Sequence, residues 1–476
     1  MIPFGELQTD LPTYQNTGAI QADNVLPLRI GYKSLPGFQE LSTTGLTGNA
    51  VGLFTAFNAG GTTNYAGDAT KLYQMNSSQE FVDKSKAGGY NNSTTEGARD
   101  FWAYTQFGTN IIAANHADNI QKFNEGTDSA FSDLVSFKAK YLAVIRDFVF
   151  TGYTTESGTS YNQRVKWSGL NNVSQWTPSQ TTQSGFQDVV GPHGNIQAII
   201  GGESFGIIFF ERAIYRVSYV GTPLIFTFEK ISDNIGLFAP RSVCSFGNMI
   251  FFLAQDGFYK LTGGQQLTPI GEGKIDPNNS CVFWSYRGGA TGSTTGDINN
   301  KLLIYNYSVD RFSTGSSMDI QYIATASQEA FTTLESLDKL GTLDNLPKSL
   351  DSYYYGEGIV GLAGFSGDKK FGKFIATSLT ATVDTTEFEG AKGRRSTLIS
   401  STPIVDGVGG TSVTVTPLSR SSQLDTVNVG TAVSTLTNGS CPMRSTSRFH
   451  RMRVKVTGNF TTMSGVEIEA RPEGKR

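Results

Sequence analysis

Charged residues are scarce in this chain of 476 residues, and neither sign dominates. Asp, Glu, Lys and Arg together make up 17% of the sequence, against about 25% in an average soluble domain, and the formal net charge is −3. Such a chain has no overall basic field to attract nucleic acid. Any contact with nucleic acid must therefore come from a local group of cations.

Cysteine and histidine are rarer still, and their spacing excludes the common metal motifs. The three cysteines, Cys244, Cys281 and Cys441, lie far apart and form no Cys-x-x-Cys pair. We therefore expect three isolated buried thiols rather than a zinc site or a disulfide framework. No histidine stands at a recognised metal-ligand spacing from a second ligand type, so each is interpreted as a structural or surface residue. The histidines are His116, His193 and His450.

Catalytic and nucleotide-binding motifs are also absent from the sequence. It contains no Gly-x-Ser-x-Gly elbow, no His-Glu-x-x-His pair, no phosphate-binding loop and no Asp box of the kind that sialidase propellers repeat. Asp233, Asp256 and Asp310 fall in predicted turns, where Asp commonly hydrogen-bonds locally. The glycine-rich stretches 60–67 and 288–296 lack the flanking strand and helix of a phosphate cradle, so we expect loop tips there. The sequence thus predicts no enzyme, no cofactor and no metal.

Long hydrophobic runs are missing as well. The longest, such as GIIFFE and MIFFLA, have the length of a β-strand and fall far short of the roughly 20 residues that cross a bilayer. The first residues, MIPFGELQTDLP, carry neither the cationic nor the apolar region of a signal peptide. We therefore expect a soluble protein that is made in the cytoplasm.

Glycine and aromatic residues, by contrast, are abundant, with 54 Gly and 12% aromatic residues. Glycine permits tight turns and aromatic side chains cover sheet faces, so this composition is typical of an all-β protein. A short apolar strand, a polar turn and a second strand with an aromatic residue recur along the chain, often roughly 40–50 residues apart. The repeats lie at 50–75, 109–123, 141–153, 205–220, 249–261, 301–313 and, more weakly, 351–365.

The repeated unit predicts a β-propeller. Turns such as Gln255-Asp256-Gly257 and 115–118 separate apolar runs, which is the signal of a hairpin. Several hairpins side by side would leave many open strand edges, whereas stacking around an axis protects them. Because the spacing is irregular and no repeat carries a strict signature, we predict an irregular propeller of six to seven blades. An assembly of β-sandwiches is the alternative.

Changes in composition divide the chain into three segments. Residues 1–44 are rich in proline and are interpreted as an extended arm that lies against another part of the protein or a neighbouring subunit. Residues 45–365 hold the predicted propeller, with a short helix at 327–340 where apolar residues recur at helical spacing. Residues 366–476 alternate Thr, Ser and Val with other residues and predict a C-terminal β-rich, sandwich-like domain, the platform. Its strands are expected at 378–390, 410–418, 448–458 and 464–472.

Two tryptophans are candidates for ligand binding. Trp167 and Trp176 lie on either side of a predicted turn. Exposed indoles could stack on a carbohydrate, but we favour the structural interpretation, in which both side chains pack a blade turn.

A run of cations near the C-terminus is the second candidate site. It contains no acidic residue and consists of Arg444, Arg448, Arg451, Arg453 and Lys455. Strand alternation would place the last three on one face. We interpret this face as a solvated surface or a contact between subunits. A patch that faces DNA in a channel is the alternative.

Segments spread over nearly the whole chain resemble one protein family. The most specific are WSGLN, within 164–176, and the RF-R-R-V pattern within 441–458. The others are 101–123, 199–223, 235–243, 252–271, 302–313, 334–352, 385–407 and 464–476. Together they resemble the tail hub or nozzle proteins of short-tailed bacteriophages, a class that includes the packaged-DNA stabilisation proteins. The chain departs from the family's WSG-x-N-Asp-Pro pattern at Asn172-Val173, which predicts a softer turn.

The resemblance implies a structural protein of the virion tail, synthesised in the host cytoplasm. It implies a homo-hexamer, a ring that closes the tail channel, retains the packaged double-stranded DNA and opens for ejection. Its expected partners are the adaptor and portal ring proteins, distal tail fibre or spike proteins, the genome in the channel and, transiently, the host cell surface. A receptor- or glycan-binding propeller on the tail surface is the alternative.

Overall fold

The structure is a computed structural model that describes residues 1–9, 11–13, 15–58, 61–95, 98–270, 281–288, 299–327 and 360–473. Within these residues the chain is built from β-strands, and one short 3-10 helix, η1 (Pro240–Ser242), is the single helical element. The all-β prediction is therefore confirmed for the described part of the chain. The predicted helix at 327–340 lies outside the described residues, except for Ser327, which ends a strand.

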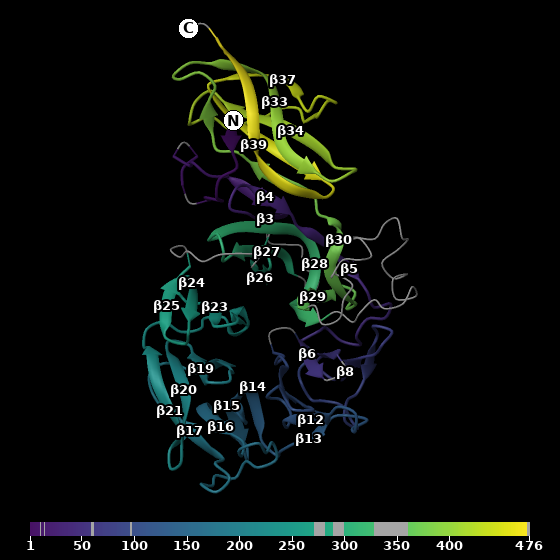
Figure 1. The fold of residues 1–476 in the computed structure, drawn as a ribbon, viewed down its shortest axis with the longest axis vertical. Helices are drawn as coiled ribbons and strands as arrows, with labels where there is room; N and C mark the ends of the chain where they lie inside the picture. The colour runs from purple at the N-terminus through teal and green to yellow at the C-terminus, as the bar shows by residue number, and fades with distance from the viewer. Residues whose placement is uncertain are drawn as a thin grey trace.

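Five consecutive antiparallel sheets of four strands each form the blades of a propeller (Figure 1). Blade 1 consists of β6 (Gly52–Asn58), β7 (Gly61–Gly67), β8 (Leu72–Met75) and β9 (Phe81–Asp83). Blade 2 consists of β10 (Ala103–Phe107), β11 (Asn110–Ala114), β12 (Gln121–Asn124) and β13 (Ser132–Asp133). Blade 3 consists of β14 (Lys138–Ile145), β15 (Phe148–Glu156), β16 (Thr159–Trp167) and β17 (Gly185–Asp188).

Blades 4 and 5 continue the same order. Blade 4 consists of β18 (Ile196–Ile200), β19 (Phe205–Phe210), β20 (Ile214–Gly221) and β21 (Ile225–Ser232). Blade 5 consists of β22 (Cys244–Phe246), β23 (Met249–Leu253), β24 (Phe258–Thr262) and β25 (Gln266–Pro269). The predicted hairpins at 109–123, 205–220 and 249–261 form the central strands of blades 2, 4 and 5, as expected.

The last part of the ring is organised around one long strand, β28 (Arg311–Ser327), which belongs to two sheets. Its first half pairs with β27 (Asn299–Asn306), which in turn pairs with β26 (Cys281–Tyr286). Its second half, from Ile320, pairs with β29 (Val360–Ser366), and the sheet continues through β30 (Phe371–Ser378) to β5 (Pro36–Glu40). Counting the two halves as one blade or two gives six or seven blades. The fold is therefore the irregular propeller of six to seven blades that the repeats predict.

Among the described residues, seven apolar clusters close the ring, one between each pair of neighbouring sheets. Trp102 and Phe123 belong to the cluster between blades 1 and 2, for example, and the ring centroids of Phe209 and Phe252 lie 5.0 Å apart between blades 4 and 5. The last cluster joins Phe365 of β29 to Tyr73 of blade 1. Because burial of apolar surface drives folding, this continuous circuit holds the ring shut and leaves few open sheet edges.

One glycine-rich stretch differs from its prediction. Residues 60–67 were expected to form a loop tip, but Gly61–Gly67 forms strand β7. The physical reason is packing, because a Cβ atom on Gly67 would lie 2.4 Å from Cδ1 of Trp102. Glycine is needed here so that the indole can lie against the backbone, not for mobility. The other stretch, 288–296, lies outside the described residues beyond position 288, and the weak repeat at 351–365 is described only from 360.

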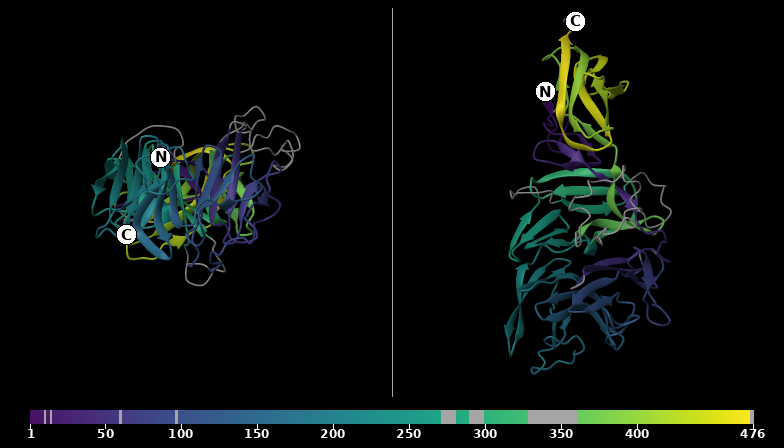
Figure 2. Two further views of the ribbon diagram at one scale, coloured as in Figure 1. Left: turned by 90° about the horizontal axis from the view of Figure 1, so that it is seen from below. Right: turned by 45° about the vertical axis from the view of Figure 1, so that its right-hand side comes forward.

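The platform is a sandwich of two sheets beside the propeller (Figures 1 and 2). One sheet contains β33 (Ser396–Gly407), β37 (Cys441–Ser447) and β39 (Phe460–Pro472). The facing sheet contains β31 (Ala381–Asp384), β32 (Phe388–Glu389), β34 (Ser412–Arg420), β35 (Asn428–Val429), β36 (Val433–Ser434) and β38 (Phe449–Thr457). Val415, Val454, Leu398, Phe460 and Met463 are among the buried residues between the sheets. The strands predicted at 410–418, 448–458 and 464–472 are all present.

The N-terminal segment joins the two parts of the molecule. β1 (Ile2–Pro3) and β4 (Tyr32–Ser34) pair with β39 of the platform, and β3 (Val25–Pro27) pairs with β4. β2 (Gln21–Asp23) pairs with β28 on one side and β31 on the other, so one sheet runs from propeller to platform. Residues 1–44, predicted to form an extended arm, thus supply strands to both parts. The chain enters the platform after β30, so the boundary between propeller and platform lies later in the chain than the predicted one at 365.

Candidate functional site

The predicted cation strand is β38, and its side chains alternate as expected. His450, Met452, Val454 and Val456 point into the sandwich and are buried. The alternate residues, Arg451, Arg453 and Lys455, lie on the outer face of the sheet. This geometry follows from strand alternation, because inward apolar residues leave the intervening positions facing outward.

Carboxylates neutralise much of this outer face. Arg453 forms two hydrogen bonds with Asp384 of β31, at 2.7 and 2.8 Å, and the Asp384 side chain is only 3% exposed. These contacts raise the pKa of Arg453. Arg420 of β34 forms the same bidentate pair with Glu387, in which Nε and Nη2 each donate to one carboxylate oxygen at 2.7 Å. Such paired geometry fixes the ions to each other and leaves them little freedom to bind a polyanion.

The remaining cations do not form one patch. Arg448 donates to Glu389 at 2.8 Å, and the backbone N–H of Gly393, together with this contact, lowers the pKa of the Glu389 carboxyl. Arg444 is exposed, but it lies on β37, in the other sheet of the sandwich. Lys455 is the exposed cation of β38, whereas partial burial lowers the pKa of Arg451. Of the five residues, Arg444 and Lys455 are exposed without a carboxylate partner among the described residues, and they lie on two different sheets, which is a weak basis for binding DNA.

The two candidate tryptophans are buried in the propeller. Trp167 is 5% exposed, packs against Phe226 at 5.2 Å and donates from Nε1 to the carbonyl of Gln183. Trp176 is 6% exposed and donates to the carbonyl of Val173. Neither indole presents a free face to a sugar, and the geometry matches the interpretation that both anchor blade turns.

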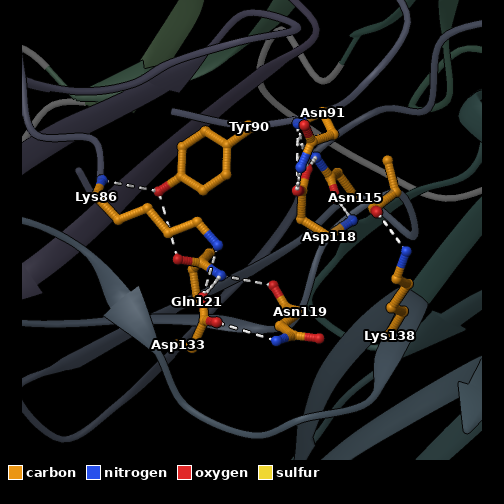
Figure 3. A network of polar contacts seen from close by, with 10 residues as sticks. Lys86, Tyr90, Asn91, Asn115, Asp118, Asn119, Gln121, Asp133 and Lys138 are labelled. Atoms are coloured by element: carbon orange, nitrogen blue, oxygen red, sulfur yellow. Dashed lines mark hydrogen bonds and ion pairs between the residues drawn. The ribbon is translucent and has the colours of Figure 1, made fainter. Parts of the chain in front are cut away.

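A polar network between blades 1 and 2 was missed by the sequence reasoning (Figure 3). Asp118, which is 4% exposed, accepts from the backbone N–H of Asn91 at 3.0 Å and from the side chain of Asn115 at 3.1 Å. Asp133 accepts from Lys86 at 2.8 Å and from Gln121 at 2.6 Å. Every carboxylate in the network is engaged by donors of the protein, so the network fastens two blades and offers no free acid or base. The Asn and Asp residues of the hairpin at 115–118 were its signal in the sequence.

The histidines and cysteines build no reactive centre in the described part of the chain. No group of three or more His, Cys, Asp or Glu side chains could hold a metal ion among the described residues. His193 and His450 are buried, and partial burial lowers the pKa of His116. The prediction of three buried thiols is correct for Cys441 alone, because Cys281 is half-buried and Cys244 is exposed at the edge strand of blade 5.

Contacts of helix η1 join segments of the propeller that are not neighbours in the chain. Helix η1 lies between blades 4 and 5, and its Arg241 guanidinium lies 3.4 Å from the ring centroid of Phe101, which precedes blade 2. The indole of Trp284 donates to the carbonyl of Ser242 in the same helix. The Arg241–Phe101 contact thus links the segment that precedes blade 5 to the segment that precedes blade 2.

No helix among the described residues is long and apolar enough to span a membrane.

No protein-family model matches the chain, and no curated protein matches it in sequence. Among solved structures, the fold is similar to BamB from Moraxella catarrhalis, with a TM-score of 0.34, 9% identity and coverage of 74% of this chain and 92% of that chain. It is also similar to BBS1N in complex with ARL6DN, with a TM-score of 0.27 and 12% identity. That match covers 43% of this chain and 62% of the BBS1N chain, less than two thirds of its length. Similarities this distant assign no function, and the propeller rests on the ring of sheets described above.

Proposed function

We propose that this protein is a structural subunit of a phage tail nozzle or hub, which assembles as a ring of six copies, retains packaged DNA and opens for ejection. The proposal starts from the family resemblance of the dispersed sequence segments. The structural observation that supports it best is the continuous sheet through β2, which joins propeller and platform. A subunit that resists the pressure of packaged DNA needs a propeller and a platform that do not move independently. The sheet that both parts share holds them in a fixed relation to each other.

The charge distribution supports retention by shape rather than by adhesion. Affinity for DNA grows with the number of phosphates that cations neutralise. Here Arg453, Arg448 and Arg420 are paired with carboxylates, and the formal net charge is −3. A channel wall of this kind would let DNA slide once the ring opens. Exposed Arg444 and Lys455 remain the candidates for a DNA or subunit contact.

Electron cryomicroscopy of virus particles that carry this chain would test the proposal. A short peptide tag inserted at Gly409-Gly410, in an exposed turn where added atoms meet nothing within 4 Å, would mark the subunit. The proposal expects the tag six times around the tail axis, next to the adaptor and portal rings. A tag found on peripheral fibres would refute it and favour the receptor-binding alternative.

A further inference from the structure

A polar groove lies between blades 3 and 4, with a volume of ≈ 490 Å³. Strand β16, the end of β17, the connector that follows it and the turn between β19 and β20 supply its walls. The groove is within the size range of small-ligand sites, but it is lined mainly by amide, guanidinium and backbone groups rather than by apolar side chains. Its polar side chains belong to Tyr161, Asn162, Gln163, Arg164, Asp188, Asn195 and Arg212.

The walls of the groove are held in place by hydrogen bonds. Gln163 donates to the carbonyls of Gly191 and Gly194, both at 2.9 Å, and accepts from the N–H of Gly191. Gly194 has a φ of +82°, and a Cβ atom there would lie 2.3 Å from Glu211, so the connector requires glycine at this position. Asn162 donates to the side chain of Asn195 at 2.8 Å. A site whose groups are fixed in advance loses less entropy when a ligand binds.

Charge pairing decides which group in the groove remains free. Asp188 accepts two hydrogen bonds from Arg164, at 2.7 and 2.8 Å, and the Arg164 guanidinium lies 3.6 Å from the ring centroid of Tyr161. That pair is satisfied internally. Arg212 is exposed, and the one hydrogen bond described for its guanidinium runs from Nη2 to the carbonyl of Pro192, at 2.8 Å. Its other N–H groups are available, because a guanidinium carries five donors.

We propose that this groove binds an acidic saccharide, with the carboxylate of a uronic acid on Arg212 and sugar hydroxyls on the side chains of Asn162 and Asn195. A guanidinium binds a carboxylate through two parallel hydrogen bonds, and carboxamides both donate to and accept from hydroxyl groups. The carboxylate of Asp188 is occupied by Arg164, and the carboxylate of Glu211 beside the groove accepts from Asn195 and Gln197, at 2.9 and 3.2 Å. A phosphate-rich ligand would need several free cations, and the groove has one.

This inference is independent of the proposed nozzle function, since a ring subunit and a monomeric propeller could both carry such a groove. The probe is a trimer of galacturonic acid, and the neutral control is maltotriose. Saturation-transfer NMR and titration calorimetry on the whole chain would measure binding. Arg212→Ala removes the proposed anchor from an exposed position, and Arg444→Ala is the matched control, an exposed arginine on the platform.

The proposal expects saturation transfer to the acidic trimer, weaker transfer to maltotriose, and at least a tenfold loss of affinity in Arg212→Ala with none in Arg444→Ala. Asn162→Ala, also at an exposed position, should weaken binding severalfold. Absence of transfer at millimolar ligand would overturn the proposal, as would equal binding of the neutral sugar. Undiminished binding by Arg212→Ala would place the ligand elsewhere. A peptide carboxylate that binds through Arg212 while the acidic trimer does not would identify a peptide site instead.

Discussion

Lys373 of β30 should make the stability of the propeller depend on pH. Its side chain is 4% exposed, and no hydrogen bond or ion pair links it to the described residues. It borders a cavity of ≈ 10 Å³ at the seam between blade 1 and the β28–β5 sheet, beside the unpaired Oε1 atom of Gln79. The cavity has room for about one water molecule. Burial lowers the pKa of Lys373 from 10.5 to about 7.

The direction and size of the effect follow from proton binding. Between pH 7 and 10.5 the unfolded chain holds a proton on Lys373 that the folded chain lacks, so the free energy of unfolding should rise with pH across this window. Below pH 7 both states are protonated, and the cost of burying the ammonium is constant. A shift from 10.5 to about 7 corresponds to a cost on the order of 5 kcal/mol at most.

Thermal unfolding of Lys373→Met at pH 6, 8 and 9.5 would test this reasoning. Methionine fills a similar volume without a charge, so the variant should unfold at a higher temperature than the parent chain. The gain should be largest at pH 6 and should shrink towards pH 9.5. Lys230→Met, at an exposed strand position, is the control and should show no such trend. A gain that is the same at all three pH values, or a loss at pH 6, would refute the argument.

Three further predictions concern the packing and charges described above. Gly67→Ala should destabilise the propeller by about 1–3 kcal/mol in denaturant titrations because of the contact with Trp102, whereas Gly361→Ala, with open space around it, should be nearly neutral. Arg453→Ala should cost about 2–4 kcal/mol because it leaves the carboxylate of Asp384 buried and unpaired; a double-mutant cycle with Asp384→Ala that shows no coupling would contradict this. If Lys455 contacts DNA, Lys455→Ala should reduce the slope of log affinity against log salt by about one, and an unchanged slope would exclude that contact.

Local sequence patterns predicted the strands well, but they could not predict contacts between residues that lie far apart in the sequence. Alternation in 448–458 indicated correctly which residues of β38 face outward. The alternation does not indicate that Arg453 binds Asp384, a residue 69 positions away. From the sequence alone, the net positive charge of the cation run is therefore overestimated. Likewise β5 lies in a proline-rich segment with little periodicity, and it becomes a propeller strand only because β30 offers an edge for it.

The polar groove illustrates the same limit at a candidate site. Its residues come from three separate stretches of chain, and none of them belongs to a recognised motif. Only the fold brings Arg212 of one blade beside Asn162 of another. The sequence pointed only to Trp167 and Trp176 as possible sugar-binding residues, and the structural interpretation was favoured for both, because aromatic residues also pack between the blades of a propeller.

The coupling between propeller and platform depends on one buried cation as well as on the shared sheet. Arg311, the first residue of β28, is 6% exposed and donates to the carbonyls of Leu28, Arg29 and Phe4, at 2.6, 3.3 and 3.4 Å. These acceptors belong to the N-terminal segment that pairs with the platform. A buried guanidinium is costly unless its donors are satisfied, so separating the segment from β28 would leave the charge without partners. The two parts of the molecule should therefore move as one body, and any opening of a ring built from this chain would occur at contacts between subunits.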